Sequence, residues 1–330
     1  MKWGIIGCGD VTEVKSGPGF QKAAGSALVA VMRRDGAKAR DYAQRHGVAR
    51  AYDRAEDLIH DPGVDAVYVA TPPSTHAELA RAVAAAGKPC LVEKPMARTH
   101  ADCLLMLEAF AARGVPLWVA YYRRALPRFL LVRDRIAEGA IGTVTSVHVD
   151  VRAPLAQGTS SAGWRFDPTV AGGGLFFDLA SHCFDLLDFI LGPLRDVSGV
   201  AANTGHAYGA EDVVVASFAT SGGVLGTGVW NFNASSAFDR VTFTGTSGEI
   251  LMPVFSDTDV IVRGASGETV HIVRNPPHVH QPLIQAIVDE YRGGTPSPST
   301  GVSAARTSWV LDQCVAGFYK GSRLKTNGLI

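Results

Sequence analysis

Two side chains that could exchange a proton lie four residues apart, after a run of three glycines. Gly172, Gly173 and Gly174 precede an apolar segment that carries Asp178 and His182. At this spacing both side chains project from one face of a helix, with Cβ atoms roughly 5–6 Å apart. A carboxylate beside an imidazole suits general acid–base chemistry, and the glycines let a ligand approach the backbone closely. A core helix with a capping aspartate and an incidental histidine explains this segment alone equally well.

A second pair of glycines lies at the other end of the chain, directly after an apolar strand pattern at 2–6. In a strand–turn–helix unit the first glycine makes the tight turn. The second lets the backbone reach a pyrophosphate, which then lies at the N-terminus of the helix. The usual third small residue is Thr12 here, so the motif is incomplete. The pattern predicts four cofactor-binding positions, Gly7, Gly9, Asp10 and Val11.

The elements that must position these residues alternate over the next hundred residues. Apolar strand patterns occur at 28–32, 64–70, 89–92 and 116–120, and alanine-rich helical patterns at 36–46, 75–87 and 99–113. Parallel strands that are buried on both faces have continuous apolar sequences of this kind. The pattern predicts an α/β domain with a doubly wound parallel sheet that binds a nucleotide.

After residue 122 an amphipathic helix at 126–138 leads into a region of strands joined by turns. Strand patterns occur at 144–152, 212–220, 223–233, 240–245, 259–263 and 269–274. We therefore expect two domains, a nucleotide-binding domain at 1–121 and an α+β domain at 122–330. The second would hold a large open, mostly antiparallel sheet with helices on one face.

The strand pattern at 223–233 is apolar on both faces, with Leu225 and Val229 on one and Trp230 and Phe232 on the other. Such a strand must be covered on both faces. The helix at 175–190 provides one cover. A second copy of the chain would provide the other, so we expect a homodimer or homotetramer.

The composition argues against several other classes of protein. Among 330 residues, 31 Lys and Arg balance 31 Asp and Glu, so no net field favours nucleic acid or an anionic membrane. No apolar run approaches the roughly 20 residues of a membrane helix, and a strand occupies the place of a signal peptide. The five cysteines lack the spacing of metal ligands and indicate reduced thiols in a cytoplasmic protein without a metal.

Taken together, these segments resemble the Gfo/Idh/MocA oxidoreductases, which include glucose-fructose oxidoreductase and inositol dehydrogenase. The resemblance covers nearly the whole chain, and its segments occur in the family's order. They are Gly7-Cys8-Gly9, Thr71-Pro72-Pro73-Ser74-Thr75-His76, Glu93-Lys94-Pro95 and the stretch from Gly172 to His182, with Tyr122-Arg123-Arg124, Trp164-Arg165 and Glu211-Asp212 as further similarities.

The resemblance implies a Rossmann domain and a role for each of these segments. Lys94, at the carboxyl end of a strand where ligands bind in such sheets, would contact the nicotinamide side and the substrate oxygen, with a cis peptide before Pro95. His182 would donate and accept the proton, and Asp178 would orient the substrate or the imidazole. The other implied cofactor-binding residues are Thr71, Pro72, Pro73, His76, Glu93, Trp164 and Arg165. His76 could instead simply start a helix, and Trp164 could simply pack on the sheet.

These roles predict hydride transfer between a nicotinamide and the carbinol or carbonyl carbon of a sugar, cyclitol or related polyol. We expect Asp178 and His182 to face Lys94 across a cleft that holds one small substrate. Substrate choice is expected in loops at 153–170 and 231–238. Two other functions of this family stay open, a ligand-sensing regulator without catalysis and a glycoside hydrolase that retains NAD.

The end of the second strand indicates which cofactor is bound. An NAD-preferring domain usually places an acid there for the ribose 2′-hydroxyl, but this chain has Met32, Arg33 and Arg34. A guanidinium suits a 2′-phosphate, and Asp35 is expected to cap the next helix instead. We therefore expect NADP(H), with NAD as the alternative, and Arg33 and Arg34 as cofactor-binding residues.

Overall fold

The described residues of this computed structural model, 1–155 and 163–320, form two compact units. The first comprises Met1–Leu126 together with Asn275–Ala305, and the second comprises Pro127–Arg274 together with the chain from Arg306 onward. This division differs from the single cut that the sequence predicts between 121 and 122. The chain returns to the first unit because helix α10 (Gln281–Tyr291) buries its apolar face there.

The first unit is built on a sheet of parallel strands in the order β3-β2-β1-β4-β5-β6, as expected for a doubly wound fold. Its strands are β1 Lys2–Ile6, β2 Ala27–Met32, β3 Arg50–Tyr52, β4 Ala66–Val69, β5 Cys90–Val92 and β6 Leu117–Val119. Its helices are α1 Asp10–Val14, α2 Gly17–Lys22, α3 Gly36–His46, α4 Ala55–Ile59, α5 His76–Ala85, α6 His100–Arg113 and α10. The order of strands reverses between β1 and β4, so a ligand crevice is expected at the carboxyl ends of these two strands.

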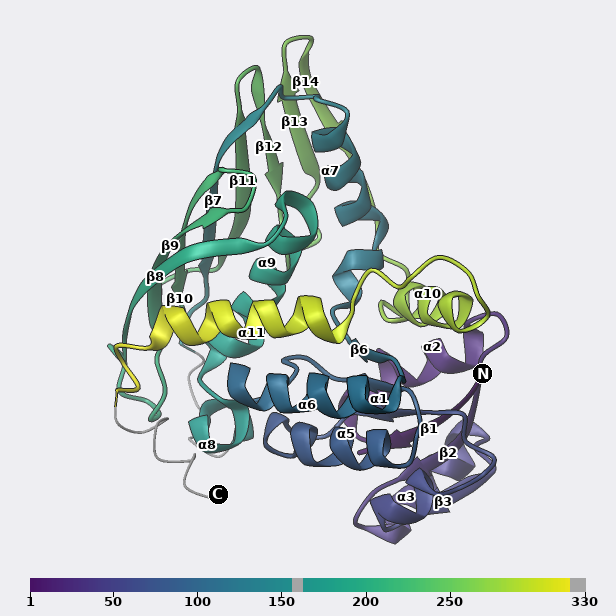
Figure 1. Cartoon of the computed structure of the whole chain (residues 1–330). Helices are drawn as coiled ribbons and strands as arrows, with labels where there is room; N and C mark the ends of the chain where they lie inside the picture. The colour runs from purple at the N-terminus through teal and green to yellow at the C-terminus, as the bar shows by residue number, and fades with distance from the viewer. Residues whose placement is uncertain (156–162, 321–330) are drawn as a thin grey trace. The chain divides into compact units, whose positions relative to one another are not determined.

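Apolar cores lie on both faces of this sheet. On one face Val67 and Val92 pack with Val83 of α5 and Met106 of α6, two helices that lie side by side in Figure 1. On the other face the core includes Trp3 and residues of α2, α3 and α10. This double burial explains why the sequence of these strands is apolar throughout.

The second unit contains a sheet in the order β14-β13-β12-β11-β7-β10-β9-β8, whose only parallel pair among the described strands is β7 with β10. The strands are β7 Val144–Arg152, β8 Leu194–Ala202, β9 Val213–Thr220, β10 Leu225–Asn231, β11 Phe238–Gly245, β12 Gly248–Met252, β13 Val260–Gly264 and β14 Gly267–His271. The helices are α7 Pro127–Ala137, α8 Pro168–Ala171 and α9 Leu175–Leu191, and α11 (Gly301–Val315) runs from the first unit into the second. The mostly antiparallel sheet predicted from the sequence is confirmed.

Helix α9 covers one face of this sheet, as expected. The ring of Phe184 on α9 lies 4.9 Å from that of Trp230 on β10 and 5.8 Å from that of Phe218 on β9, measured between centroids. The opposite face of the sheet is largely exposed and carries apolar side chains on β8, β9 and β10 beside polar ones on β7. Val200 of β8 pairs with Val215 of β9, and their side chains are 76% and 47% exposed, while Leu225 is 65% exposed.

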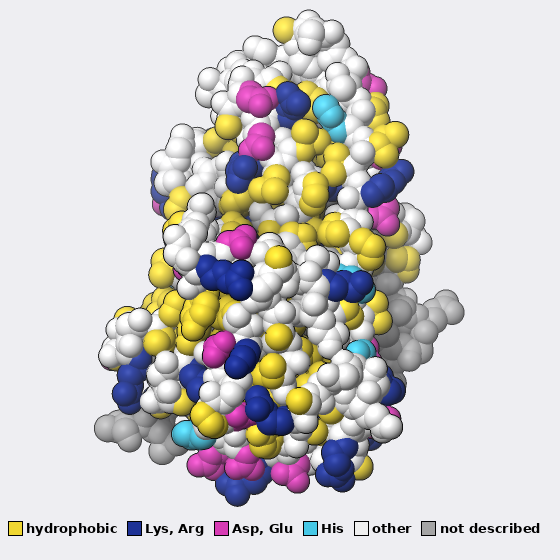
Figure 2. All heavy atoms as spheres, turned by 90° about the vertical axis from the view of Figure 1, so that its right-hand side faces the viewer, with side chains coloured by type: hydrophobic (Ala, Val, Ile, Leu, Met, Phe, Trp, Pro, Cys, Tyr) yellow, Lys and Arg dark blue, Asp and Glu magenta, His cyan; other side chains and the backbone are white. Residues whose placement is uncertain are grey.

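Charges of both signs are interspersed on the face of the molecule that Figure 2 shows, in keeping with the balanced composition. Within 1–155 and 163–320 we find no helix that is both long enough and apolar enough to cross a membrane.

Candidate active site

Gly7 follows β1 and has a backbone angle φ of +92°, a conformation that residues other than glycine rarely adopt. A Cβ at this position would lie 2.7 Å from Cγ2 of Thr71 and 3.0 Å from the carbonyl carbon of Ala70, at the end of β4. The turn after β1 and the turn after β4 are therefore in close contact at the point where the strand order reverses. Only glycine fits here without moving one of these turns.

Gly9 is the residue before α1, and Thr12 closes the turn behind it. The Thr12 hydroxyl accepts a hydrogen bond from the Gly9 N–H at 3.0 Å and donates one to the Gly9 carbonyl at 2.7 Å. A Cβ on Gly9 would meet only the Gly7 oxygen, at 3.9 Å, so its backbone stays open to an approaching group. The two glycines and the start of α1, where Asp10 is exposed and Val11 is half-buried, thus fit a pyrophosphate despite the missing third glycine.

Arg33 and Arg34 follow β2 directly and are both exposed. Nη1 of Arg33 donates a hydrogen bond to the carbonyl of Cys8 at 3.2 Å, which holds the guanidinium beside the glycine turn. Asp35 accepts hydrogen bonds from the N–H groups of Ala37 and Lys38 and caps α3, as predicted. In the sequence this capping group is the only carboxylate between β2 and the first turn of α3, and the Asp53 carboxylate packs beside that turn, with Oδ2 3.3 Å from where a Cβ on Gly36 would lie.

The segment after β4 forms a turn closed by its own side chains, which we call the β4 turn (residues 71–75). The hydroxyl of Thr75 donates to Oγ1 of Thr71 at 2.7 Å and approaches the carbonyl of Pro72 at 3.0 Å. Thr71 and Pro72 are half-buried and Pro73 is buried. His76 begins α5 and is fully buried, with Nε2 2.7 Å from the Thr71 carbonyl and Nδ1 3.1 Å from the Pro95 carbonyl. Burial lowers the pKa of His76 from its usual value.

The segment after β5, which we call the β5 turn (residues 93–96), carries Lys94 at the same edge of the sheet. The carboxyl group of Glu93 accepts hydrogen bonds from the Tyr68 hydroxyl and, at 3.0 Å, from the backbone N–H of Lys94. The peptide bond between Lys94 and Pro95 is cis, as the resemblance implies. Burial raises the pKa of Glu93 and lowers the pKa of His280, whose Nε2 lies 3.5 Å from Oε1 of Glu93, to about 3. His280 is therefore neutral near pH 7, and this contact is not an ion pair.

In the second unit, the three glycines lead into α9 and are packed against Glu211. The N–H of Gly174 donates to Oε1 of Glu211 at 2.9 Å, and the hydroxyl of Tyr319 donates to the other carboxyl oxygen. A Cβ on Gly174 would lie 2.5 Å from the Glu211 carbonyl oxygen. A fully buried carboxylate thus fixes the start of the helix that carries Asp178 and His182. The sequence shows Glu211 only as a similarity to the family, without this role.

Asp178 and His182 lie one turn apart on α9, as predicted, and Trp164 and Arg165 lie beside the first of them. Nε of Arg165 is 3.8 Å from Oδ2 of Asp178, and its guanidinium lies 4.5 Å from the centroid of the Trp164 ring. Trp164 is 37% exposed. Residues 156–162 of the loop expected to set substrate choice lie outside the described residues.

His182 is 3% exposed and packs edge-on against Phe255, with 6.2 Å between ring centroids. The loop of Phe255 is held from both sides. Asp239 accepts hydrogen bonds from three consecutive N–H groups, those of Val254, Phe255 and Ser256, at 2.6–3.0 Å. The buried Arg128 donates to the Ser256 carbonyl at 2.6 Å. The sequence gives no signal for this contact, because the loop lies more than 70 residues from His182.

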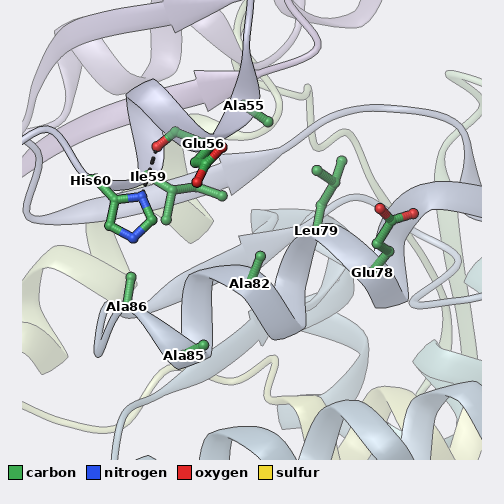
Figure 3. A pocket seen from close by; sticks show the side chains of 9 residues that line it. All are labelled: Ala55, Glu56, Ile59, His60, Glu78, Leu79, Ala82, Ala85 and Ala86. Atoms are coloured by element: carbon green, nitrogen blue, oxygen red, sulfur yellow. Dashed lines mark hydrogen bonds between the residues drawn. The ribbon is translucent and has the colours of Figure 1, made fainter.

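An open groove of about 440 Å³ lies elsewhere on the first unit, between α4 and α5 (Figure 3). Its lining is mostly apolar, with Glu56 from α4, His60 directly after that helix and Glu78 from α5. The His60 ring bonds to the carbonyl of Glu56 in the preceding helix, at 2.9 Å. The groove contains none of the residues predicted from the sequence. In the described ranges no three His, Cys, Asp or Glu side chains are grouped as metal ligands would be.

The predicted residues therefore form two groups. Gly7, Arg33, Thr71 and Lys94 follow β1, β2, β4 and β5, and so lie at one edge of the parallel sheet. Asp178 lies with Arg165 and Trp164 in the second unit, on the helix that also carries His182. The first group lies where ligands bind in open parallel sheets, and the second combines a carboxylate and a guanidinium with a buried imidazole on the same helix.

Comparisons with known proteins agree with this architecture. A family model described as an oxidoreductase family with an NAD-binding Rossmann fold matches residues 1–121, and a GFO/IDH/MocA C-terminal domain model matches 129–251. Oxidoreductase P35 of Formosa agariphila is 35% identical over 94% of this chain and 97% of its own length. The 1,5-anhydro-D-fructose reductase of Ensifer adhaerens is 29% identical over 91% of both chains. A solved structure of levoglucosan dehydrogenase with NADH and levoglucosan, 24% identical, superposes with a TM-score of 0.84 over 98% of each chain, which shows the shared fold.

Proposed function

Because the chain belongs to the GFO/IDH/MocA oxidoreductases, NAD(P)-dependent dehydrogenases and reductases that act on CH–OH groups, we propose that its own substrate is a sugar, a cyclitol or a related polyol. The observation that carries this proposal is the pair on α9. Asp178 and His182 lie on one helix face with Arg165 3.8 Å from the carboxylate, an arrangement that can bind hydroxyl groups and move a proton. The similarity to a 1,5-anhydro-D-fructose reductase supports the same substrate class.

Each residue has a distinct role in the proposed reaction. Bound nicotinamide supplies or takes up the hydride, while the protein orients the reacting groups. The ammonium group of Lys94 stabilises the negative charge that develops on the substrate oxygen, and the imidazole of His182 gives or takes the proton. Asp178 orients the substrate or the imidazole. Glu211 accepts a hydrogen bond from the Gly174 N–H at the start of α9, and so helps to hold the helix that carries both side chains.

We further propose that the cofactor is NADP(H), with Arg33 and Arg34 binding the 2′-phosphate. Arg33 is held beside the glycine turn by the Cys8 carbonyl, and Asp35 is engaged in capping α3. A guanidinium forms charge-assisted, often paired hydrogen bonds with a phosphate group. In the sequence between β2 and α3 the only carboxylate is that of Asp35, at the position of the α3 cap rather than at the end of β2.

Apolar side chains on the exposed face of the second sheet support a proposed homodimer or homotetramer. Val200, Val215 and Leu225 place large apolar side chains on a surface that a second copy of the chain could cover. We assign the subunit contacts, and the substrate contacts other than that of Lys94, to the second unit. The five cysteines are all buried and none forms a disulfide, which supports a reducing, cytoplasmic location.

A screen of sugars and inositols with NADP⁺ and NAD⁺, and of ketosugars with NADPH, tests the proposed function. We expect stoichiometric formation or consumption of free NADPH. Turnover of a glycoside without any free reduced cofactor would identify the hydrolase class instead. Tight binding of a sugar without turnover, in a protein whose Lys94, Asp178 and His182 are intact, would identify a regulator.

A further inference from the structure

His76 joins two turns of the first unit that are far apart in the sequence. Its ring has 0% exposure, and its two nitrogens point at two different backbone carbonyls. Nε2 lies 2.7 Å from the Thr71 carbonyl in the β4 turn, and Nδ1 lies 3.1 Å from the Pro95 carbonyl in the β5 turn. A residue that only starts a helix would leave its ring at the surface or bond within its own turn.

The chemistry of imidazole makes this bridge specific. A neutral ring carries one N–H, and the shorter contact assigns that proton to Nε2, so the ring donates to the Thr71 carbonyl. Nδ1 then carries a lone pair, so the Pro95 carbonyl oxygen at 3.1 Å packs against this edge of the ring without a hydrogen bond. Because His76 begins α5, whose Val83 and Ala84 are buried in the core of the unit, the ring cannot move without moving the helix. The separation of the two turns is thus set by the width of one imidazole.

The two turns carry residues with different proposed tasks. Thr71 and Pro72 are among the residues expected to bind the cofactor. Lys94 lies one residue before Pro95, whose carbonyl His76 contacts. A shift of the β5 turn would move the Lys94 ammonium relative to Thr71 and Pro72. Misplacement of a reacting group by about 1 Å can cost about 100-fold in rate.

We propose that His76 is a positioning residue that fixes the β5 turn, and with it Lys94, against the β4 turn. It is fully buried, so it contacts neither cofactor nor substrate, and it acts through the backbone of the two turns. The effect on turnover rests on the proposed function, which gives Lys94 its role. The position of the β5 turn relative to the β4 turn does not depend on that function.

The test compares three variants with the wild-type protein. His76→Leu removes both polar contacts, and His76→Gln keeps an amide N–H where Nε2 lies. Val83→Ala, in the same helix and the same core, is the matched control, because it loosens packing without touching either turn. For each variant we would measure kcat, KM and thermal stability. The rate at which trinitrobenzenesulfonate modifies Lys94 in the cofactor-free protein would be followed by peptide mass spectrometry.

We expect His76→Leu to lower kcat at least tenfold and to change the modification rate of Lys94 at least threefold. His76→Gln should recover much of the wild-type kcat and of the wild-type modification rate of Lys94. Val83→Ala should be less stable than the wild type, but its Lys94 should be modified at a rate within twofold of the wild-type rate. Unchanged Lys94 modification in folded His76→Leu and His76→Gln proteins would overturn the inference, as would an equal change in Val83→Ala. If no polyol is turned over by the wild-type protein, the proposed function fails, and the modification rates still decide the role of His76.

Discussion

Removing the two arginines after β2 should change which nicotinamide nucleotide the protein binds. Arg33 uses one N–H on the Cys8 carbonyl, so four of the five N–H groups of its guanidinium remain for a ligand. Loss of hydrogen bonds to a charged group costs about 1.5–3 kcal/mol, or roughly 10-fold to 150-fold in Kd. Because Arg33 and Arg34 are exposed, the lower end of this range applies. We expect Arg33→Ala with Arg34→Ala to raise the Kd of NADP⁺ at least about tenfold.

The same double variant should change the Kd of NAD⁺ by less than about twofold, since NAD⁺ lacks the 2′-phosphate. Titration of both nucleotides by intrinsic fluorescence or calorimetry, at low and high salt, measures the two constants directly. The difference should shrink at high salt, because screening weakens exposed charge pairs. Arg113→Ala, an exposed arginine in the last turn of α6, is the control and should affect neither nucleotide. Equal weakening of NADP⁺ and NAD⁺ would refute the reasoning.

Three further outcomes are expected. His182→Ala should lower kcat by about 10²–10⁴-fold with little change in nucleotide affinity, and Lys94→Ala should lower it at least as much; near-normal turnover of either variant would contradict the assignment. Light scattering at micromolar concentration should show a dimer or tetramer that Val215→Asp with Leu225→Lys converts to monomers, whereas a fully active wild-type monomer would exclude this assembly. Burial lowers the pKa of His280 to about 3. Between about pH 3 and pH 6.5 the folded state therefore binds fewer protons than the unfolded state, and the free energy of unfolding falls as the pH drops through this range. Urea unfolding of His280→Leu should show a slope of stability against pH that is smaller by up to about 1.4 kcal/mol per pH unit in this window, and an unchanged slope would show that His280 does not titrate there.

Local sequence signals were sufficient for the elements with strong periodicity. The alternation of Val147, Val149 and Val151 predicts β7, and all three side chains are buried as that pattern requires. Asp35 and the glycine after α3 mark the ends of that helix correctly. In these cases the residue types that favour the element are also the ones that its position in the fold requires.

Other features could not be read from the sequence because they depend on distant partners. β3 has only three residues, all half-buried, and β8 contains a glycine and charged residues, so neither has the apolar pattern of a strand. His76 looks like any helix-start residue until the Pro95 carbonyl is placed against its ring. Glu211 reads as a surface acid until the Gly174 N–H is found at its carboxylate.

The return of the chain to the first unit has a consequence for synthesis on the ribosome. One face of the parallel sheet packs against Leu283, Ile287 and Val288 of α10, which is made after the whole span Pro127–Arg274. At about 5–20 residues per second, this span takes roughly 7–30 s to translate. During that time the nascent sheet would leave Trp3 and Phe20 incompletely covered, which favours binding by chaperones. A fragment that ends at Leu126 would keep this exposed surface permanently, so the nucleotide-binding unit should be expressed with residues 275–305 attached.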